Sequence, residues 1–249
     1  MCTATWMTGD RFRYVLFNRD EGKSRSEELP PKLFQPPDSP AYLAPVDPQS
    51  GGTWIAVNEY GLVASVLNYY DALDPTALPR PGAEKSRGTL PPSAVAHKHP
   101  EDALEAIASL TQSVRFDPFL LMVQSADGQG GLLSWNGVEL NRLVLPEVRL
   151  PLTTSSWKSA EITAYRRDLF HEVVTHPPAL HQLLEFHGFY RADQPAFGPS
   201  MVREDANTRS LTMARIGADR VSMRHQYFSP ENACFLDCSE IQLNRRFSK

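Results

Sequence analysis

Cysteine is scarce in this sequence, and its three copies are Cys2, Cys234 and Cys238. A small, odd number of cysteines provides no disulfide framework and matches no four-ligand zinc pattern. We interpret Cys234 and Cys238, four residues apart, as ordinary core or loop thiols. His171 and His176 are five residues apart, which places their rings on different faces of a helix. We therefore expect no metal and no other cofactor, and a reducing compartment, the cytoplasm, as the location.

Long hydrophobic runs and a strong excess of one charge are also missing. The apolar stretches, such as residues 119–123, are too short to cross a bilayer, and residues 9–11 interrupt any signal-peptide pattern at the start of the chain. The net charge of -4 gives no basic footprint for DNA or RNA. The 249 residues are 41% hydrophobic and 22% charged, which suffices for a sizeable core. We expect a single domain over residues 1–249, without a transmembrane segment or a nucleic-acid partner.

Proline, with 21 copies, is the residue present in excess. Seven of them lie between Pro30 and Pro48, which predicts a segment that wraps the surface rather than pairing in a sheet. Residues 18–28 are expected to form a charged loop, and residues 74–82 form a second loop rich in Pro and Gly. Irregular connections should therefore be long.

Runs rich in β-branched and aromatic residues predict strands, and apolar residues at helical spacing predict helices. Residues 3–7 and 12–17 should form a hairpin about Gly9-Asp10, and residues 53–57 and 62–67 a second hairpin that turns at Gly61. Further strands are expected at 119–124, 132–135, 139–145, 149–153, 210–216 and 221–227, and helices at 100–111, 159–175 and 178–186. Strands and helices in blocks, without βαβ alternation, indicate an α+β fold of stacked sheets covered by helices.

Cys2 is the first candidate for chemistry because of its place in the chain. Methionine aminopeptidases remove Met1 when residue 2 is small, and cysteine is small enough. The new amino terminus then has a thiol and an α-amine on adjacent carbons, and such an amine has a pKa of about 7.7–8.0. The amine can take the thiol proton and later pass it to a leaving group. The alternative is a small residue that follows the start codon by chance.

The polar run Asn18-Arg19-Asp20-Glu21 follows the strand that pairs with the one beginning at Cys2. Pairing about Gly9-Asp10 places Arg19 and Asp20 beside Cys2. A guanidinium near the thiol would lower the thiol pKa, and a carboxylate could orient the α-amine. The alternative is a charged loop without a chemical role.

Several short motifs together resemble the NRDE family, also called the transport-and-Golgi-organisation family. They are Met1-Cys2-Thr3, Asn18-Arg19-Asp20-Glu21, Gly51-Gly52-Thr53-Trp54, the strand end from Ala64 to Asn68, Ser86-Arg87-Gly88 and Thr208-Arg209-Ser210-Leu211-Thr212. The motifs occur in the family's order and extend over residues 1 to 212. Where many members have Leu-Ser-Asn, this chain has Leu152-Thr153-Thr154-Ser155-Ser156, and a polar anchor expected there is missing.

The resemblance implies the N-terminal-nucleophile hydrolase fold, a four-layer αββα sandwich. It also implies a set of catalytic roles taken from related cysteine amidases. Cys2 would be the nucleophile, Arg19 would tune the thiol, Asp20 would hold the α-amine, Asn68 would donate to the oxyanion, and Arg209 would be a second arginine near the nucleophile. Candidate substrate-binding residues are Asn18, Trp54 and Ser155.

Two functions from different classes remain open from the sequence. The first is a hydrolase of carbon-nitrogen bonds other than peptide bonds, which acts on linear amide or acyl bonds through a thioester at Cys2. The second is a non-catalytic protein of the same fold that binds or transports haem or a lipid-like acyl ligand, as the resemblance also suggests. A purely structural module is a third, weaker alternative. The sequence does not identify the ligand or the oligomeric state.

Overall fold

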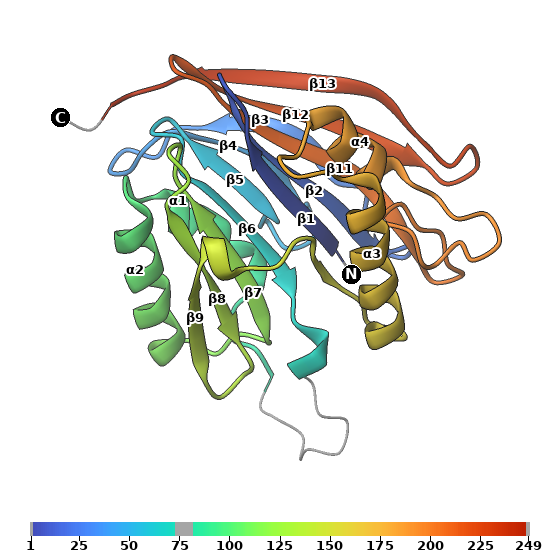
Figure 1. Cartoon of the computed structure of the whole chain (residues 1–249). Helices are drawn as coiled ribbons and strands as arrows, with labels where there is room; N and C mark the ends of the chain where they lie inside the picture. The colour runs from blue at the N-terminus through green and yellow to red at the C-terminus, as the bar shows by residue number, and fades with distance from the viewer. Residues whose placement is uncertain (1, 73–81, 248–249) are drawn as a thin grey trace.

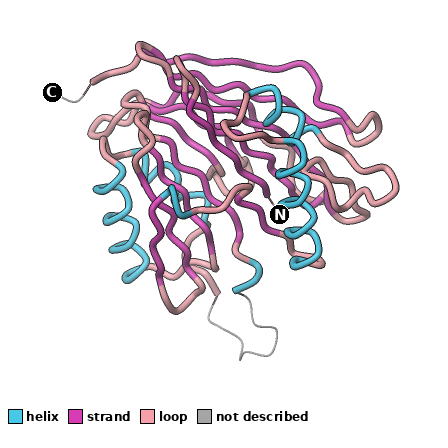
Figure 2. Tube along the Cα trace, viewed as in Figure 1, coloured by secondary structure: helices cyan, strands magenta, loops and turns pink. Residues whose placement is uncertain are grey.

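The computed structural model describes residues 2–72 and 82–247. Within them the chain forms two antiparallel sheets and four α-helices (Figures 1 and 2). Met1 and nearly all of the loop expected at 74–82 lie outside the described residues. None of the described helices has the length and apolarity needed to cross a bilayer.

The first sheet contains both ends of the described chain. Its six strands follow the order β10-β1-β2-β11-β12-β13. Their bounds are β1 (Cys2–Thr8), β2 (Arg13–Gly22), β10 (Leu152–Thr154), β11 (Ala206–Ile216), β12 (Arg220–Ser229) and β13 (Cys234–Asn244). The hairpin expected about Gly9-Asp10 is confirmed, because β1 and β2 pair along their length and Gly9 donates to the Phe12 carbonyl at 2.8 Å.

The second sheet contains the middle of the chain, with seven strands in the order β3-β4-β5-β6-β7-β8-β9. Their bounds are β3 (Leu29–Phe34), β4 (Tyr42–Val46), β5 (Ile55–Asn58), β6 (Val63–Asn68), β7 (Phe119–Gln124), β8 (Gly130–Trp135) and β9 (Leu140–Val144). The hairpin β5–β6 is the one expected, and Gly61 has the positive φ of 83° that its turn requires.

The helices cover the outer faces of the two sheets (Figure 1). Helices α1 (Leu90–Val95) and α2 (Pro100–Ser113) pack on the second sheet, and α3 (Ser159–Val173) and α4 (Leu180–Gly188) pack on the first. Three short 3-10 turns, η1 (Tyr70–Ala72), η2 (Arg87–Thr89) and η3 (Leu145–Glu147), lie in the connections. The largest buried apolar cluster fills the space between the sheets, so the layers follow the expected αββα order.

The charged loop expected at residues 18–28 is partly wrong, because β2 continues to Gly22. Asn18, Arg19 and Asp20 are therefore strand residues, and all three are buried. The strand β2 lies between β1 and β11, and both neighbours form backbone hydrogen bonds with it. The charged sequence of residues 18–22 does not by itself predict this pairing.

The surface segment expected between Pro30 and Pro48 is also wrong, since β3 and β4 pair within it. The strand β3 lies at the edge of the second sheet, where a proline without an N–H group is tolerated. The pairing shifts register between Leu29 and Lys32, around Pro30 and Pro31. The prolines are therefore accommodated by an edge and a bulge rather than by leaving the sheet.

Candidate active site

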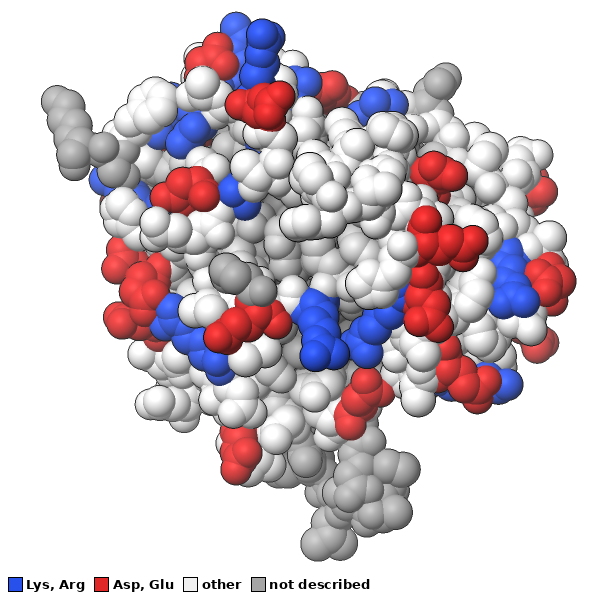
Figure 3. Space-filling view, viewed as in Figure 1, with Lys and Arg blue, Asp and Glu red and all other residues white. Residues whose placement is uncertain are grey.

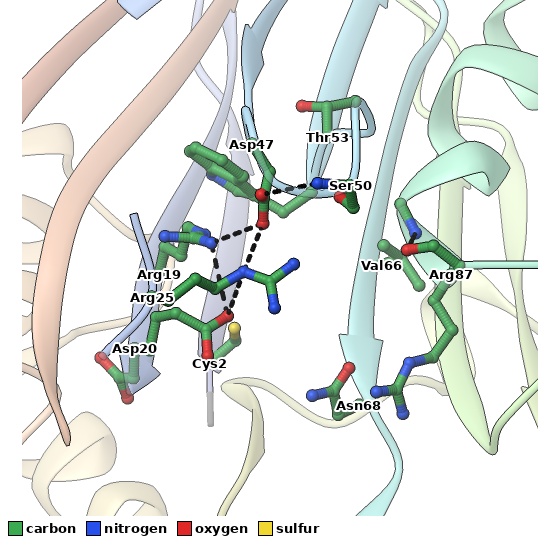
Figure 4. Close-up of a pocket in the computed structure, with 14 residues that line it drawn as sticks. Cys2, Arg19, Asp20, Arg25, Asp47, Ser50, Thr53, Val66, Asn68 and Arg87 are labelled. Atoms are coloured by element: carbon green, nitrogen blue, oxygen red, sulfur yellow. Dashed lines mark hydrogen bonds and ion pairs between the residues drawn. The ribbon is translucent and has the colours of Figure 1, made fainter. Parts of the chain in front are cut away.

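A small cavity of about 210 Å³ opens at the start of β1, between the ends of the two sheets (Figure 4). Its described lining is mostly polar or charged, and Trp54 and Val66 are the large apolar side chains in it. The expected site residues that line it are Cys2, Arg19, Asp20, Trp54 and Asn68. Strands β1 and β2 supply one wall, and β6 and the segment before η2 supply the opposite one.

The strand register brings Cys2 to Arg19, as the turn at Gly9-Asp10 predicts. The Cα of Cys2 pairs with that of Arg19 on one side and with that of Thr154 on the other. Cys2 is 9% exposed, and its sulfur faces the cavity (Figure 4). A hydrogen bond from the backbone amide of Asp20 favours the thiolate.

Burial nevertheless raises the pKa of the Cys2 thiol above its ordinary value. The positive charge of the amino terminus opposes this effect, and the negative charges of Asp20 and Glu21 add to it. The lower thiol pKa expected from Arg19 is therefore not what the structure gives. At neutral pH the thiol is protonated and needs a base.

The guanidinium of Arg19 forms ion pairs with carboxylates rather than with the Cys2 thiol. Its guanidinium donates to Glu28 at 2.5 Å and to Asp47 at 2.9 Å, with Glu21 at 3.3 Å, and it stacks 4.6 Å above the centre of the Trp54 ring. These partners neutralise the charge and fix the side chain. Arg19 is thus a structural centre of the cavity wall.

Asp20 is buried beside Cys2 and is held from two directions. Thr208 donates to its carboxylate at 2.7 Å, and Arg166 approaches the other oxygen at 3.5 Å. Burial raises the pKa of Asp20, while Arg166 and the charge of the amino terminus oppose that rise.

Arg166 was missed by the sequence analysis. It lies on α3 with no exposed surface and donates to Thr3 at 2.8 Å, to Thr153 at 3.2 Å and to the Phe197 carbonyl at 3.1 Å, as well as to Asp20. The available signal was its place on the buried face of the helix, four residues after Ile162 and three before Leu169. An arginine in an apolar stripe needs a buried partner.

Asn68 and Arg87 stand on the opposite wall from Arg25 (Figure 4). The side-chain nitrogen of Asn68 donates to the Tyr70 hydroxyl at 2.8 Å, which fixes the amide and leaves its second N–H for another acceptor. Arg87 donates one Nη to the Pro118 carbonyl at 3.0 Å. Its segment is held against the second sheet, where the Thr53 amide donates to the Gly88 carbonyl at 2.9 Å.

Arg209, Asn18 and Ser155 lie outside the described lining of the cavity. Arg209 stands at a bulge of β11, between Thr208 and Ser210, and donates to the Arg25 carbonyl at 2.6 Å. The arginines that do line the cavity, besides Arg19, are Arg25 and Arg87. A bulge redirects a side chain in a way that a sequence motif does not reveal.

Asn18 and Ser155 have structural contacts in place of the expected substrate contacts. The Asn18 amide donates to the carbonyls of His187 and Pro199 and lies 2.9 Å from His187 Nδ1. The Ser155 hydroxyl donates to the Trp157 carbonyl at 2.5 Å. Both side chains fasten the first sheet to the chain around α3 and α4.

No group of three or more potential metal ligands gathers anywhere in residues 2–72 and 82–247. Cys234 and Cys238 are exposed on β13 with free thiols. The site therefore consists of the buried thiol of Cys2, three arginines and the carboxylates of Asp20, Glu21 and Asp47 around a small polar cavity.

Comparison with known proteins identifies both a family and a fold. A family model described as "Transport and Golgi organisation 2" matches residues 1–175. No curated protein matches the sequence.

Three solved structures share the fold. An N-acylethanolamine-hydrolyzing acid amidase ortholog from Caenorhabditis elegans has a TM-score of 0.55 at 11% identity, over 86% of this chain and 92% of its own. A conjugated bile acid hydrolase from Clostridium perfringens has a TM-score of 0.51 at 13% identity, over 100% and 99%. A penicillin V acylase from Agrobacterium tumefaciens has a TM-score of 0.51 at 12% identity, over 91% and 83%. The fold is that of the N-terminal-nucleophile hydrolases.

Proposed function

The chain belongs to the Transport and Golgi organisation 2 family, and from the surroundings of Cys2 we propose that it is an N-terminal cysteine amidohydrolase. Its substrates are linear amides or related acyl compounds, and the acyl group passes through a thioester on Cys2. The observation that supports this most is the position of Cys2 at the start of β1, in the lining of the cavity and next to the buried carboxylate of Asp20.

The reaction requires a free α-amine on Cys2, so Met1 is removed first. The amine takes the thiol proton as the sulfur attacks the substrate carbonyl, which forms the S–C bond. The protonated amine then gives the proton to the leaving nitrogen as the C–N bond breaks. Water, deprotonated by the same amine, hydrolyses the thioester and releases the carboxylic acid. A protonated resting thiol fits this sequence, because the base acts during the attack.

Asp20 and Asn68 serve this chemistry from the two walls. Asp20 orients the α-amine, and Arg166 and Thr208 fix the carboxylate. Asn68 donates its second amide N–H to the oxyanion that forms on the carbonyl, while Tyr70 holds the first. Arg19 maintains the wall through Glu28 and Asp47.

The solved relatives agree with an acyl-amide substrate by their names, which describe a penicillin V acylase, a bile acid hydrolase and an acid amidase. We further propose that residues 1–249 form one domain, because the bile acid hydrolase match covers 100% of the chain. Each name describes the substrate of that relative alone. The acyl group of a substrate of this protein has to fit the cavity at Cys2.

A carrier of haem or of a long lipid chain is the second candidate, and the cavity at Cys2 does not favour it. Pockets that bury such ligands have volumes of roughly 300–1,000 Å³ and apolar walls. The cavity here has about 210 Å³ and a polar lining. A larger hollow of about 880 Å³ is separate from Cys2, and charged side chains such as Lys158, Glu161 and Arg203 line it beside Trp157 and Phe197.

Mass spectrometry tests the amidohydrolase directly. Protein from a host with methionine aminopeptidase should begin at Cys2, and incubation with a panel of acyl amides should add one acyl mass to the N-terminal peptide. Hydroxylamine should remove that mass, as it does from thioesters. Cys2→Ala should form no adduct, whereas Cys234→Ala should form it normally.

The Asn68→Ala variant tests the oxyanion donor. It should lose about 10²–10³-fold in kcat, the usual effect of removing one such donor. Retention of Met1 in the native protein, or turnover that persists in Cys2→Ala, would refute the mechanism.

A further inference from the structure

The arginines around the cavity differ in how many of their N–H donors are bound to carboxylates or carbonyls of the protein. Arg19 has three carboxylate partners. Arg25 donates its Nε to Asp47 at 2.7 Å, and its two Nη atoms have no acceptor within residues 2–72 and 82–247. Arg87 has no carboxylate partner in the same part of the chain and uses only one Nη, toward the Pro118 carbonyl. Each of the two guanidinium groups thus has four of its five N–H donors left over.

The acidic side chains of the lining do not compensate for these donors. Asp20 is paired with Arg166, and Glu21 and Asp47 lie at the Arg19 side of the cavity. Burial acts to raise the pKa of Asp47, but hydrogen bonds from Arg25 and from the Ser50 amide, together with the charges of Arg19 and Arg25, outweigh it and lower the pKa. Arg19 and Arg25 share the carboxylates of Glu21, Glu28 and Asp47, so Arg25 contributes unused N–H donors rather than unpaired charge. Within residues 2–72 and 82–247, the arginine of the lining without a carboxylate partner is Arg87.

The geometry points these two groups at the same space. Figure 4 shows the Arg25 terminus directed into the open cavity, with the Cys2 sulfur on the same side, and the Arg87 guanidinium beside Asn68 on the opposite side. On the face drawn in Figure 3, basic and acidic side chains are interspersed without one large basic area. Selectivity for charge would therefore come from this local pair.

We propose that the ligand of this cavity carries an anionic group, a carboxylate or a phosphate, which Arg25 and Arg87 hold near Cys2. The inference deepens the proposed function by naming its substrate class: short acyl compounds with a negative charge close to the bond that reacts. Guanidinium groups bind such oxyanions through paired, charge-assisted hydrogen bonds. The small polar cavity does not fit a long apolar acyl chain.

Alkylation of Cys2 by a matched pair of reagents tests the proposal without using hydrolysis as a readout. Iodoacetate and iodoacetamide have the same size and leaving group and differ in the negative charge. The rate ratio of iodoacetate to iodoacetamide at Cys2, measured by peptide mass spectrometry at pH 9, should exceed the ratio at exposed Cys234 and Cys238 by about tenfold or more. The rate with iodoacetate should also saturate with reagent concentration.

Variants assign the effect to the two arginines. The double variant Arg25→Gln/Arg87→Gln should lower the ratio at Cys2 to that of the exposed thiols. Arg115→Gln is the matched control, because Arg115 is an exposed arginine paired with Glu84 outside the cavity lining, and the ratio should stay unchanged. Glutarate and inorganic phosphate, added as competitors of iodoacetamide, distinguish a carboxylate from a phosphate by which of them protects Cys2.

A wild-type ratio at Cys2 no higher than at Cys234 and Cys238 overturns the anion site, and this measurement needs no variant to fold. The two proposals fail separately. A charge preference without any acyl-enzyme keeps the anion site and removes the amidohydrolase. An acyl-enzyme formed from neutral amides, with equal alkylation ratios at all three thiols, keeps the amidohydrolase and removes the anion site.

Discussion

The Cα atoms of Cys2 and Arg19 are paired across β1 and β2, yet the guanidinium of Arg19 bonds to Glu28 and Asp47 rather than to the thiol. Strand register decides which residues are neighbours, and the surrounding carboxylates decide what each neighbour does. Burial of Cys2, together with the negative charges of Asp20 and Glu21, raises the thiol pKa. An active Cys2 therefore depends on a base rather than on a preformed thiolate.

The first prediction concerns the pH dependence of Cys2 alkylation. Since burial raises the thiol pKa, the thiolate fraction of Cys2 stays small at neutral pH and grows only in the alkaline range. The iodoacetamide rate at Cys2 should reach half its maximum above about pH 8.5, the value for a free cysteine. Rates from pH 6 to 10, followed by peptide mass spectrometry, provide the measurement. A half-maximum well below the free-cysteine value would contradict the structure and restore the thiolate expected from the sequence.

The second prediction concerns Arg166, which is fully buried and pairs with Asp20. Replacing it by Met removes the guanidinium that neutralises the Asp20 carboxylate and donates to two threonine hydroxyls, and breaking a buried ion pair in this way costs about 3–5 kcal/mol. The free energy of unfolding from urea titration should fall by that amount in Arg166→Met. Arg167→Met, on the exposed face of the same helix, should change it little. Equal stability of the two variants would mean that Asp20 does not rely on Arg166.

The third prediction concerns His187, whose ring lies between Asn18 and Thr5. Burial lowers its pKa to about 3, so the folded state keeps the ring neutral while the unfolded chain binds a proton below pH 6.5. The unfolded state binds more protons in this window, so stability is fully present above pH 6.5 and is lost as the pH falls toward 3. The decline in unfolding free energy from pH 7 to pH 4 should be smaller in His187→Gln than in wild type.

Exposed His171 supplies the control for this titration, because His171→Gln should keep the wild-type decline. His225, with a pKa lowered to about 4 by burial, adds a contribution of the same sign that is present in all three proteins. An identical pH dependence of wild type and His187→Gln would show that the ring is not held neutral.

The sequence sufficed for the parts of the fold that short-range patterns determine. The turn at Gly9-Asp10 fixed the register of β1 and β2, and with it the neighbours of Cys2. The strand β7 and the start of α2 at Pro100 agree with their apolar patterns. These elements carry their own signals, independent of what packs on them.

Other parts depend on distant neighbours that no local pattern reveals. The strand β13 alternates apolar and polar residues only at its end, where Ile241 and Leu243 pack on the core, and its longer first part pairs with the open edge of β12. In the sequence Arg166 is an ordinary helix residue, and its partner Asp20, 146 positions away, is brought to it only by the tertiary fold. Arg209 belongs to a motif, but the bulge after Thr208 turns it from the cavity. Motifs thus predicted which segments meet, and tertiary contacts determined which side chains face the cavity.

The last prediction concerns Gly52 and Gly88, whose backbones are in direct contact. A Cβ added at Gly52 would lie 2.6 Å from the Gly88 carbonyl carbon, closer than van der Waals contact permits, and the obstacle is backbone rather than a movable side chain. The clash would push the segment that carries Arg87 away from β5 and weaken the bond from the Thr53 amide to the Gly88 carbonyl. Gly52→Ala should therefore lower the free energy of unfolding by about 1–3 kcal/mol, as overpacking does.

The same variant should reduce the preference of Cys2 for iodoacetate, since Arg87 moves although no charge is removed. Gly188→Ala is the control, because a Cβ there meets nothing within 4 Å and alanine favours the end of α4. Gly52→Ala should therefore have a lower free energy of unfolding in urea titration, and a lower alkylation ratio at Cys2, than Gly188→Ala. If Gly52→Ala matched Gly188→Ala in stability and in the ratio, the contact of Gly52 with Gly88 could not be what places Arg87 at the cavity.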